Sequence, residues 1–144
     1  MGQAREVLDR LTQTAVNQRD VDGAVELYAD DAVVVTPDLG EIRGREGIRD
    51  YWATFIDAFS DSHYDTVDKY ETGSSAIDEG FYVGTNTAPL KMPTGESLPP
   101  TGRQIKLRSC DIAKVEDGKI VEHHLYFDQA AFLAQLGLEP GSSG

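Results

Sequence analysis

The sequence contains few of the residues on which disulfide-stabilised or metal-binding folds depend. It has a single cysteine, Cys110, so no disulfide can form within the chain. Of its three histidines, His123 and His124 are adjacent and would point to opposite faces of a strand, while His63 lies in another segment. We therefore expect no metal site. No glycine-rich phosphate loop follows a predicted strand, so we expect no nucleotide cofactor.

Positive charge is also scarce. The chain has 13 Lys and Arg residues against 25 Asp and Glu residues, which gives a formal net charge of −12. Such a protein repels phosphate backbones and anionic lipid, so nucleic acid and membrane surfaces are poor candidate partners. Apolar runs stay far below the ~18 residues of a membrane span. Charged residues at 5, 6, 9 and 10 leave no signal-peptide stretch, and we expect a cytoplasmic location.

The length of 144 residues suits one domain with one core, which we place at residues 1–138, before a disordered tail at 139–144. We predict a helix over 3–17 and a short second helix that Asp20 caps and that includes Tyr28. A β-branched run at 32–35 predicts a strand. The third helix shows one broad apolar face with helical spacing. Its members are Ile48, Tyr51, Trp52, Phe55, Ile56 and Phe59.

Strand patterns dominate the rest of the chain. We predict strands over 63–71, 77–87, 103–115 and 119–128. A proline-rich loop at 89–102 interrupts them, and a short helix at 129–136 ends at Gly137. Three N-terminal helices and a long antiparallel meander predict an α+β domain with helices across the concave side of a curved sheet. Such a fold would enclose a cone-shaped, largely apolar pocket.

The last hairpin determines which residues face that pocket. Residues 116–118 fit a three-residue loop that ends in a left-handed glycine. A loop of this length pairs Val115 with Lys119. Odd-numbered residues then line the pocket and even-numbered residues face outward. The predicted inward pairs are Ala113 with Val121, Asp111 with His123, Ser109 with Leu125, and Leu107 with Phe127.

Asp111 and His123 are thus expected to be neighbours within an apolar pocket. A carboxylate beside an imidazole fixes the tautomer of the ring and raises its basicity, which makes a competent general base. A buried polar contact whose only role is to tie two strands together would bring the same two side chains together. The sequence leaves both interpretations open.

Other residues are assigned by face. Phe81 shares a strand face with Ile77 and Val83, and we expect it to line the pocket. The outer face of the sheet also has apolar character, which predicts a homodimer through paired sheets. Its members are Cys110, Ile112, Ile120, His124 and Tyr126.

In this order of elements, the sequence resembles the SnoaL-like branch of the nuclear transport factor 2-like superfamily over nearly its whole length. The resemblance rests on short segments in a fixed order. They are QRD at 18–20, LYADD at 27–31, GREGI at 44–48, LPPTGR at 98–103, VEDGKI at 115–120, FD at 127–128 and QLG at 135–137. It implies the cystatin-like roll of that superfamily, in which the third helix is a wall of the pocket. Among the aromatic residues of that helix, Tyr51 and Phe55 therefore have the best claim to the pocket. The family includes polyketide cyclases, ketosteroid isomerases and limonene-type epoxide hydrolases.

The resemblance implies site residues position by position. The cyclases and epoxide hydrolases have an aspartate on the last strand where this chain has Leu125. The isomerases have a base at the end of the first strand, where this chain has Thr36. Asp111 matches the position of an acid that stabilises an oxyanion in the isomerases. The catalytic sets of the family are therefore incomplete here.

We hypothesise an enzyme that moves protons on a small hydrophobic ketone or polyketide-like molecule, by cyclisation or isomerisation. His123 is the expected base, oriented by Asp111; if Asp111 is protonated, it becomes the donor instead. Ser109 and Thr36 are expected hydrogen-bond donors to the substrate. Two alternatives remain, a non-catalytic binding protein and a dimeric scaffold whose side chains fill the cavity. Leu125 and Thr36 favour the binding protein, because neither can exchange a proton.

Overall fold

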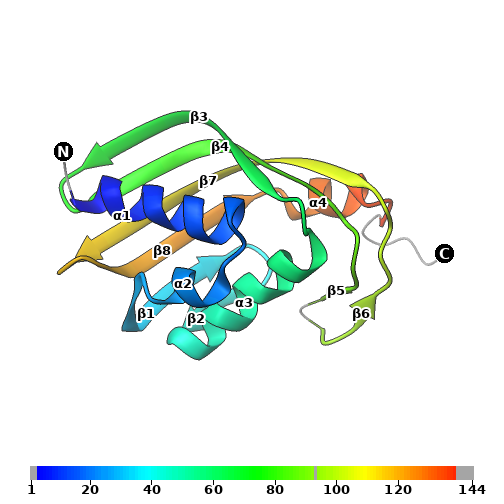
Figure 1. Ribbon diagram of the computed structural model, residues 1–144, viewed down its shortest axis with the longest axis horizontal. Helices are drawn as coiled ribbons and strands as arrows, with labels where there is room; N and C mark the ends of the chain where they lie inside the picture. The colour runs from blue at the N-terminus through cyan, green and yellow to red at the C-terminus, as the bar shows by residue number, and fades with distance from the viewer. Residues whose placement is uncertain (1–2, 93, 139–144) are drawn as a thin grey trace.

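The computed structural model describes residues 3–92 and 94–138 and has an α+β architecture (Figure 1). The predicted tail at 139–144 lies outside the described residues. The helices are α1 (Gln3–Leu11), the π-helical turn η1 (Thr12–Asn17), α2 (Val21–Val25), α3 (Arg45–Ala58) and α4 (Gln129–Gln135). None of them is long and apolar enough to cross a membrane.

Six strands form one mixed, mostly antiparallel sheet in the order β2-β1-β8-β7-β4-β3. They are β1 (Tyr28–Thr36), β2 (Gly40–Arg43), β3 (His63–Thr72), β4 (Ser75–Thr85), β7 (Gln104–Glu116) and β8 (Lys119–Phe127). Only the β1–β8 pair is parallel among the strand pairs of the described residues. The proline-rich segment, predicted as a loop, contains a second small sheet of β5 (Leu90–Lys91) and β6 (Ser97–Leu98).

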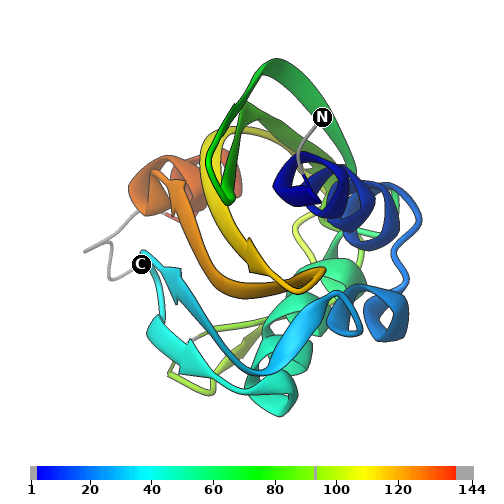
Figure 2. The ribbon, with the colours of Figure 1, turned by 90° about the vertical axis from the view of Figure 1, so that its left-hand side faces the viewer.

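The sheet curls around the N-terminal helices (Figure 2). Helix α1 lies across β4 and β7, and α3 packs against β1, β2 and β5. The core is divided into two clusters of buried apolar side chains. One joins α1, η1 and α3 to the middle of the sheet, and the other joins the end of α3 to α4 and β7. The predicted curved sheet with helices on its concave side is confirmed.

Local capping follows the sequence. The Asp20 carboxylate accepts from the Gly23 amide at 3.0 Å and begins α2. Gly137, at φ +79°, ends α4 in the left-handed conformation. Tyr28 differs from the prediction, because it begins β1 instead of ending the second helix.

The β7–β8 turn also differs from the prediction. Asp117 (φ 53°) and Gly118 (φ 77°) form a two-residue loop, and Glu116 pairs with Lys119. Positive φ at both central residues defines a type I′ turn, and the twist of this turn matches the twist of the two strands of a hairpin. The three-residue loop predicted from 116–118 is therefore wrong.

A bulge at Val121 then restores the predicted faces. Val115 pairs with Ile120, but Lys114 pairs with Glu122, so Val121 has no partner in the ladder. Beyond the bulge the pairs are Ala113 with His123, Asp111 with Leu125, and Ser109 with Phe127. Beyond the bulge each predicted pair is thus displaced by two residues, which keeps the odd-numbered side chains inward. Ile120, expected on the outer face, is fully buried in the core.

Candidate functional site

The concave face of the sheet and its covering helices frame a cavity of about 90 Å³, called here the inner cavity. Its lining is mostly apolar and aromatic. The residues from helices are Leu11, Thr12, Val16, Tyr51, Trp52, Phe55 and Phe132. Those from strands are Tyr64, Tyr82, Leu107, Ser109, Asp111, Leu125, Tyr126 and Phe127. Asp111 is the one carboxylate among these lining residues.

A chain of hydrogen-bonded side chains leads from helix α3 to this carboxylate. Trp52 Nε1 donates to Tyr28 Oη at 3.1 Å. Tyr28 Oη lies 2.8 Å from His123 Nδ1. His123 Nε2 in turn lies 2.7 Å from Asp111 Oδ2. Four residues that are distant in sequence thus form one continuous polar path through the apolar core.

One arrangement of protons satisfies every member of the path. The indole of Trp52 can only donate, so Tyr28 Oη accepts from it. The Tyr28 hydroxyl hydrogen then goes to His123 Nδ1, because no other acceptor for it lies within reach among the described residues. His123 carries its proton on Nε2 and donates to an ionised Asp111. Burial, and to a smaller extent the Asp111 carboxylate, raises the pKa of Tyr28, which keeps its hydroxyl protonated.

Exposure separates the two members of the predicted pair. The His123 side chain is 0% exposed and does not line the inner cavity, whereas the Asp111 side chain is 14% exposed and does. Both ring nitrogens of His123 are occupied by Tyr28 and Asp111. The group that a ligand in the cavity would meet is therefore the carboxylate, with the imidazole behind it.

A second carboxylate lies directly across from the first. Asp78 on β4 pairs with Asp111 on β7. Its buried side chain forms an ion pair with Arg5 of α1, at 2.5 Å between Oδ1 and Nη2. Burial, and then the charge of Asp111, raises the pKa of Asp78. Arg5 also bonds Asp9 and the carbonyl of Ile77, so this acid belongs to the attachment of α1 to the sheet.

Two hydroxyl groups lie on the Asp111 side of the cavity. Ser109 is two residues from Asp111 on β7, so both side chains share a face. The Tyr64 hydroxyl lies 3.1 Å from Ser109 Oγ. Burial raises the pKa of Tyr64, so this hydroxyl stays neutral and able to donate.

The structure brings together most of the predicted pocket residues. Asp111 and five of the predicted contacts line the inner cavity, namely Tyr51, Phe55, Ser109, Leu125 and Phe127. Their roles toward a ligand remain predictions.

Phe81 lies on the other side of the sheet. It pairs with Arg108, and the Lys106 ammonium and the Arg108 guanidinium lie 4.8 and 5.3 Å from its ring centroid. The prediction that Phe81 faces the pocket is wrong, because the even-numbered residues of β4 point inward. Tyr82 lines the cavity in its place.

Thr36 lies at the end of β1 but lines neither this cavity nor the outer cavity described below. Its buried hydroxyl accepts from the Leu39 amide at 3.0 Å, which fixes the turn into β2. That bond gives Thr36 a role in the turn; its predicted donation to a substrate remains a prediction.

Tyr28, Trp52 and Tyr82 were not predicted as site residues. A usable signal existed for Trp52 and Tyr28, since a buried indole or phenol requires a hydrogen-bond partner. The sequence does not reveal which partner, because Tyr28, Trp52 and His123 come from separate elements.

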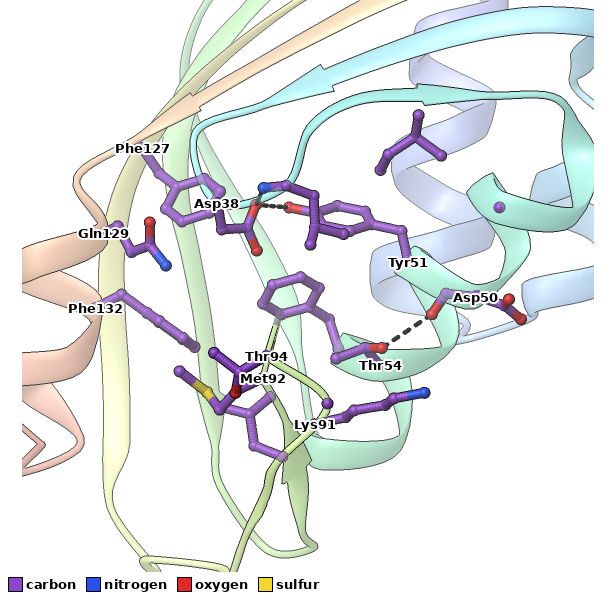
Figure 3. A pocket seen from close by; sticks show the side chains of 16 residues that line it. Asp38, Asp50, Tyr51, Thr54, Lys91, Met92, Thr94, Phe127, Gln129 and Phe132 are labelled. Atoms are coloured by element: carbon purple, nitrogen blue, oxygen red, sulfur yellow. Dashed lines mark hydrogen bonds between the residues drawn. The ribbon is translucent and has the colours of Figure 1, made fainter.

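A larger cavity of about 480 Å³, called here the outer cavity, lies between α3, the β5 segment and the start of α4 (Figure 3). Four aromatic residues, Tyr51, Phe55, Phe127 and Phe132, line both cavities. The Tyr51 hydroxyl donates to Asp38 Oδ1 at 3.2 Å. Polar lining residues of the outer cavity are Asp38, Asp50, Thr54, Lys91, Thr94 and Gln129.

Solved structures share this fold over nearly the whole chain. IdmH from Streptomyces antibioticus, for which polyketide cyclase activity has been proposed, is 30% identical with a TM-score of 0.76 and covers 94% of this chain and 99% of its own. A SnoaL-like protein from Jannaschia sp. CCS1, also a proposed polyketide cyclase, is 16% identical with a TM-score of 0.81, over 96% and 94%.

A third structure, with a ketosteroid isomerase-like fold from Catenulispora acidiphila, was solved in complex with trimethylamine. It is 17% identical with a TM-score of 0.76, over 96% of this chain and 98% of its own. No curated protein gave a significant sequence match. Residues 8–123 match the family described as the SnoaL-like domain. The chain therefore belongs to the SnoaL-like domain family.

Proposed function

We propose that this protein is an enzyme that moves a proton on a small, mostly apolar ketone or polyketide-like molecule, leading to cyclisation or isomerisation. The observation that carries the proposal is a carboxylate at an aromatic cavity whose second oxygen is held by a buried, fully bonded imidazole. Asp111 replaces His123 as the proposed proton acceptor, and His123 becomes a positioning residue.

In the proposed step, ionised Asp111 first removes a proton from the carbon between two carbonyl groups of the substrate. The C–H electron pair becomes an enolate, and the proton resides on Asp111. The Nε2–H of His123 remains hydrogen-bonded to the other carboxyl oxygen of Asp111 and limits the rotation of that carboxyl group. The enolate then attacks a second carbonyl, whose oxygen takes the proton from Asp111, or it accepts that proton at another carbon; either way Asp111 returns to its ionised form. The Ser109 and Tyr64 hydroxyls are candidate donors to the enolate oxygen.

Turnover can be tested without the natural substrate. We would follow hydrogen–deuterium exchange at the acidic carbon of apolar β-diketones by proton NMR. Asp111→Asn should lower the catalysed rate by about 10²–10⁴-fold, the usual contribution of a general base. Asp31→Asn, the same change at an exposed position of β1, should leave it unchanged. Equal rates in wild type and Asp111→Asn would refute the proposal.

The second candidate is a binding protein of the same fold without chemistry. Leu125 lines the cavity at the position where the resemblance implies an aspartate, and it cannot exchange a proton. The neighbour from Catenulispora acidiphila held the small organic molecule trimethylamine, which fits either candidate. Saturable binding of a β-diketone with no catalysed exchange would favour the binding protein.

We also propose a homodimer through the outer sheet face. Cys110 pairs with Tyr126 and Ile112 with His124, which gives adjacent apolar positions on β7 and β8. Tyr126 is 51% exposed, so this part of the sheet presents a large aromatic side chain to solvent. Sedimentation equilibrium should give a dimer for wild type and a monomer for Ile112→Lys; a monomeric wild type would contradict the proposal.

A further inference from the structure

We infer that a ligand of this protein occupies both cavities, with an uncharged multi-ring or elongated body in the outer cavity and only its reactive carbonyl end in the inner one. This inference rests on the proposed function for the identity of the reactive end. It adds the outer cavity as the recognition site and Phe55 as the residue that determines specificity.

Size is the first argument. Pockets that enclose small organic ligands usually measure ~300–1,000 Å³. The inner cavity, at about 90 Å³, has room for only a small group, whereas the outer cavity, at about 480 Å³, is within that range. A ligand that reaches Asp111 must therefore leave most of its volume outside the inner cavity.

The boundary between the cavities is the second argument. The four aromatic residues that line both cavities form what we call the aromatic partition. The ring centroids of Tyr51 and Phe55 are 5.1 Å apart, and those of Phe55 and Phe132 are 6.0 Å apart. Tyr51 is tethered through its hydroxyl to Asp38. Phe55 is partly exposed and, as a hydrocarbon side chain, has no such tether. The Phe55 ring contacts both Tyr51 and Phe132, so we assign the width of the passage between the two cavities to this central ring of the partition.

Charge is the third argument. The lining of the outer cavity contains the carboxylates of Asp38 and Asp50 and the ammonium of Lys91. This gives the lining one more negative than positive charge, on a protein with a net charge of −12. An anionic ligand such as a phosphate ester would be repelled. The apolar surface of Ile42, Leu90 and Met92 instead suits an uncharged ring system with polar edges.

The chain contains one reporter for each cavity. Trp52 is the only tryptophan and lines the inner cavity. Met92 is one of two methionines and lines the outer cavity. The indole N–H signal of Trp52 and the methyl signal of Met92 in NMR spectra thus report occupancy of the two cavities separately. A Met92→Leu variant assigns the methyl signal.

The first experiment titrates three related probes. The two-ring ketone 2-acetyl-1-naphthol should shift both signals with one dissociation constant. The one-ring 2′-hydroxyacetophenone and the anionic 1-hydroxy-2-naphthoate should each bind at least about tenfold more weakly, a difference of ~1.4 kcal/mol. Different dissociation constants from the two signals, a shift at one signal only, no binding at all, or equal affinity for the anion would overturn the inference.

The second experiment widens the passage. The bulkier 2-benzoyl-1-naphthol should shift only the Met92 signal in wild type, and both signals in Phe55→Ala. Phe55→Leu is the second variant, in case the alanine variant fails to fold, and should give an intermediate response. Phe81→Ala makes the same change on the opposite sheet face and should behave as wild type. A Trp52 shift in wild type, or none in either Phe55 variant, contradicts the assignment of Phe55.

Both experiments measure binding and can be repeated in Asp111→Asn. Occupancy of both cavities without any catalysed exchange in wild type would refute the proposed function alone. Catalysed exchange with a probe that never shifts Met92 would refute the inference alone.

Discussion

Asp78 and Asp111 are directly opposite each other on neighbouring strands, yet they have different surroundings. Asp78 is paired with the guanidinium of Arg5, which also bonds Asp9 and backbone carbonyls. Asp111 is held by the imidazole of His123 and borders the inner cavity. The carboxyl group of Asp78 is enclosed by its bonds to α1 and lines neither cavity, whereas the carboxyl group of Asp111 keeps one oxygen beside the inner cavity. The same residue type thus attaches a helix at one position and, in the proposed function, accepts a proton at the other.

The most disruptive test of this comparison removes the charge from the partner of Asp78. Arg5→Met keeps much of the side-chain stem but leaves a buried carboxylate unpaired. We expect a loss of about 2–3 kcal/mol in the free energy of unfolding, below the ~3–5 kcal/mol of fully buried pairs because the guanidinium keeps some solvent contact. Urea unfolding measures this. Arg5→Met combined with Asp78→Leu should recover part of the loss, and a loss below about 1 kcal/mol would contradict the role assigned to Arg5.

The partner of Asp111 can be tested further along its hydrogen-bonded path. Tyr28→Phe removes the hydroxyl that joins Trp52 to His123 and leaves a buried donor and a buried acceptor unpaired. We expect a cost of about 1–3 kcal/mol in unfolding free energy. Tyr64→Phe, which removes a half-buried hydroxyl, should cost less. The comparison fails if the Tyr64 variant loses as much stability as the Tyr28 variant.

The smallest expected effect is on the dependence of stability on pH. Burial and the Asp111 charge raise the pKa of Asp78 above its ordinary 3.8, so the folded protein holds this proton more tightly than the unfolded chain does. The resulting stabilisation is complete below pH 3.8 and is lost as pH rises through the folded pKa.

Urea unfolding at several pH values, in wild type and Asp78→Asn, isolates this contribution. The variant lacks the titrating group, so the stability of wild type relative to the variant should fall as pH rises from about 4. A relative stability that rises over the same range would show that the attraction of Arg5 for the ionised form outweighs burial.

Much of the fold could be predicted from local chemistry. Asp20 at the start of α2, the β-branched run of β1, the aromatic face of α3 and Gly137 after α4 each determine structure within a few residues. The β7–β8 register could not, because it depends on a bulge at Val121 that the local sequence does not specify. The prediction that Asp111 and His123 share a face is confirmed, although through a different turn and a different ladder.

The error at Phe81 has a general cause. Hydrophobic alternation assigns the apolar set of a strand to the core. On β4 the apolar set Ile77, Phe81 and Val83 faces outward, where Lys106 and Arg108 lie over the Phe81 ring. The inward set contains Asp78, Gly80 and Tyr82. Asp78 pairs with Arg5 of α1, Gly80 leaves room for the Asp65 carbonyl and the Tyr64 ring, and Tyr82 lines the inner cavity. The pattern therefore misleads in the strand that borders the candidate site.

The position of the proton on His123 tests the central claim most directly. The ring nitrogens can be observed in ¹H–¹⁵N NMR spectra of the uniformly labelled protein at neutral pH. Our account predicts a neutral ring with hydrogen on Nε2 and an unprotonated Nδ1 that accepts from Tyr28. A ring with hydrogen on Nδ1 alone would require Asp111 to donate to Nε2, and would contradict an ionised Asp111 ready to accept a proton.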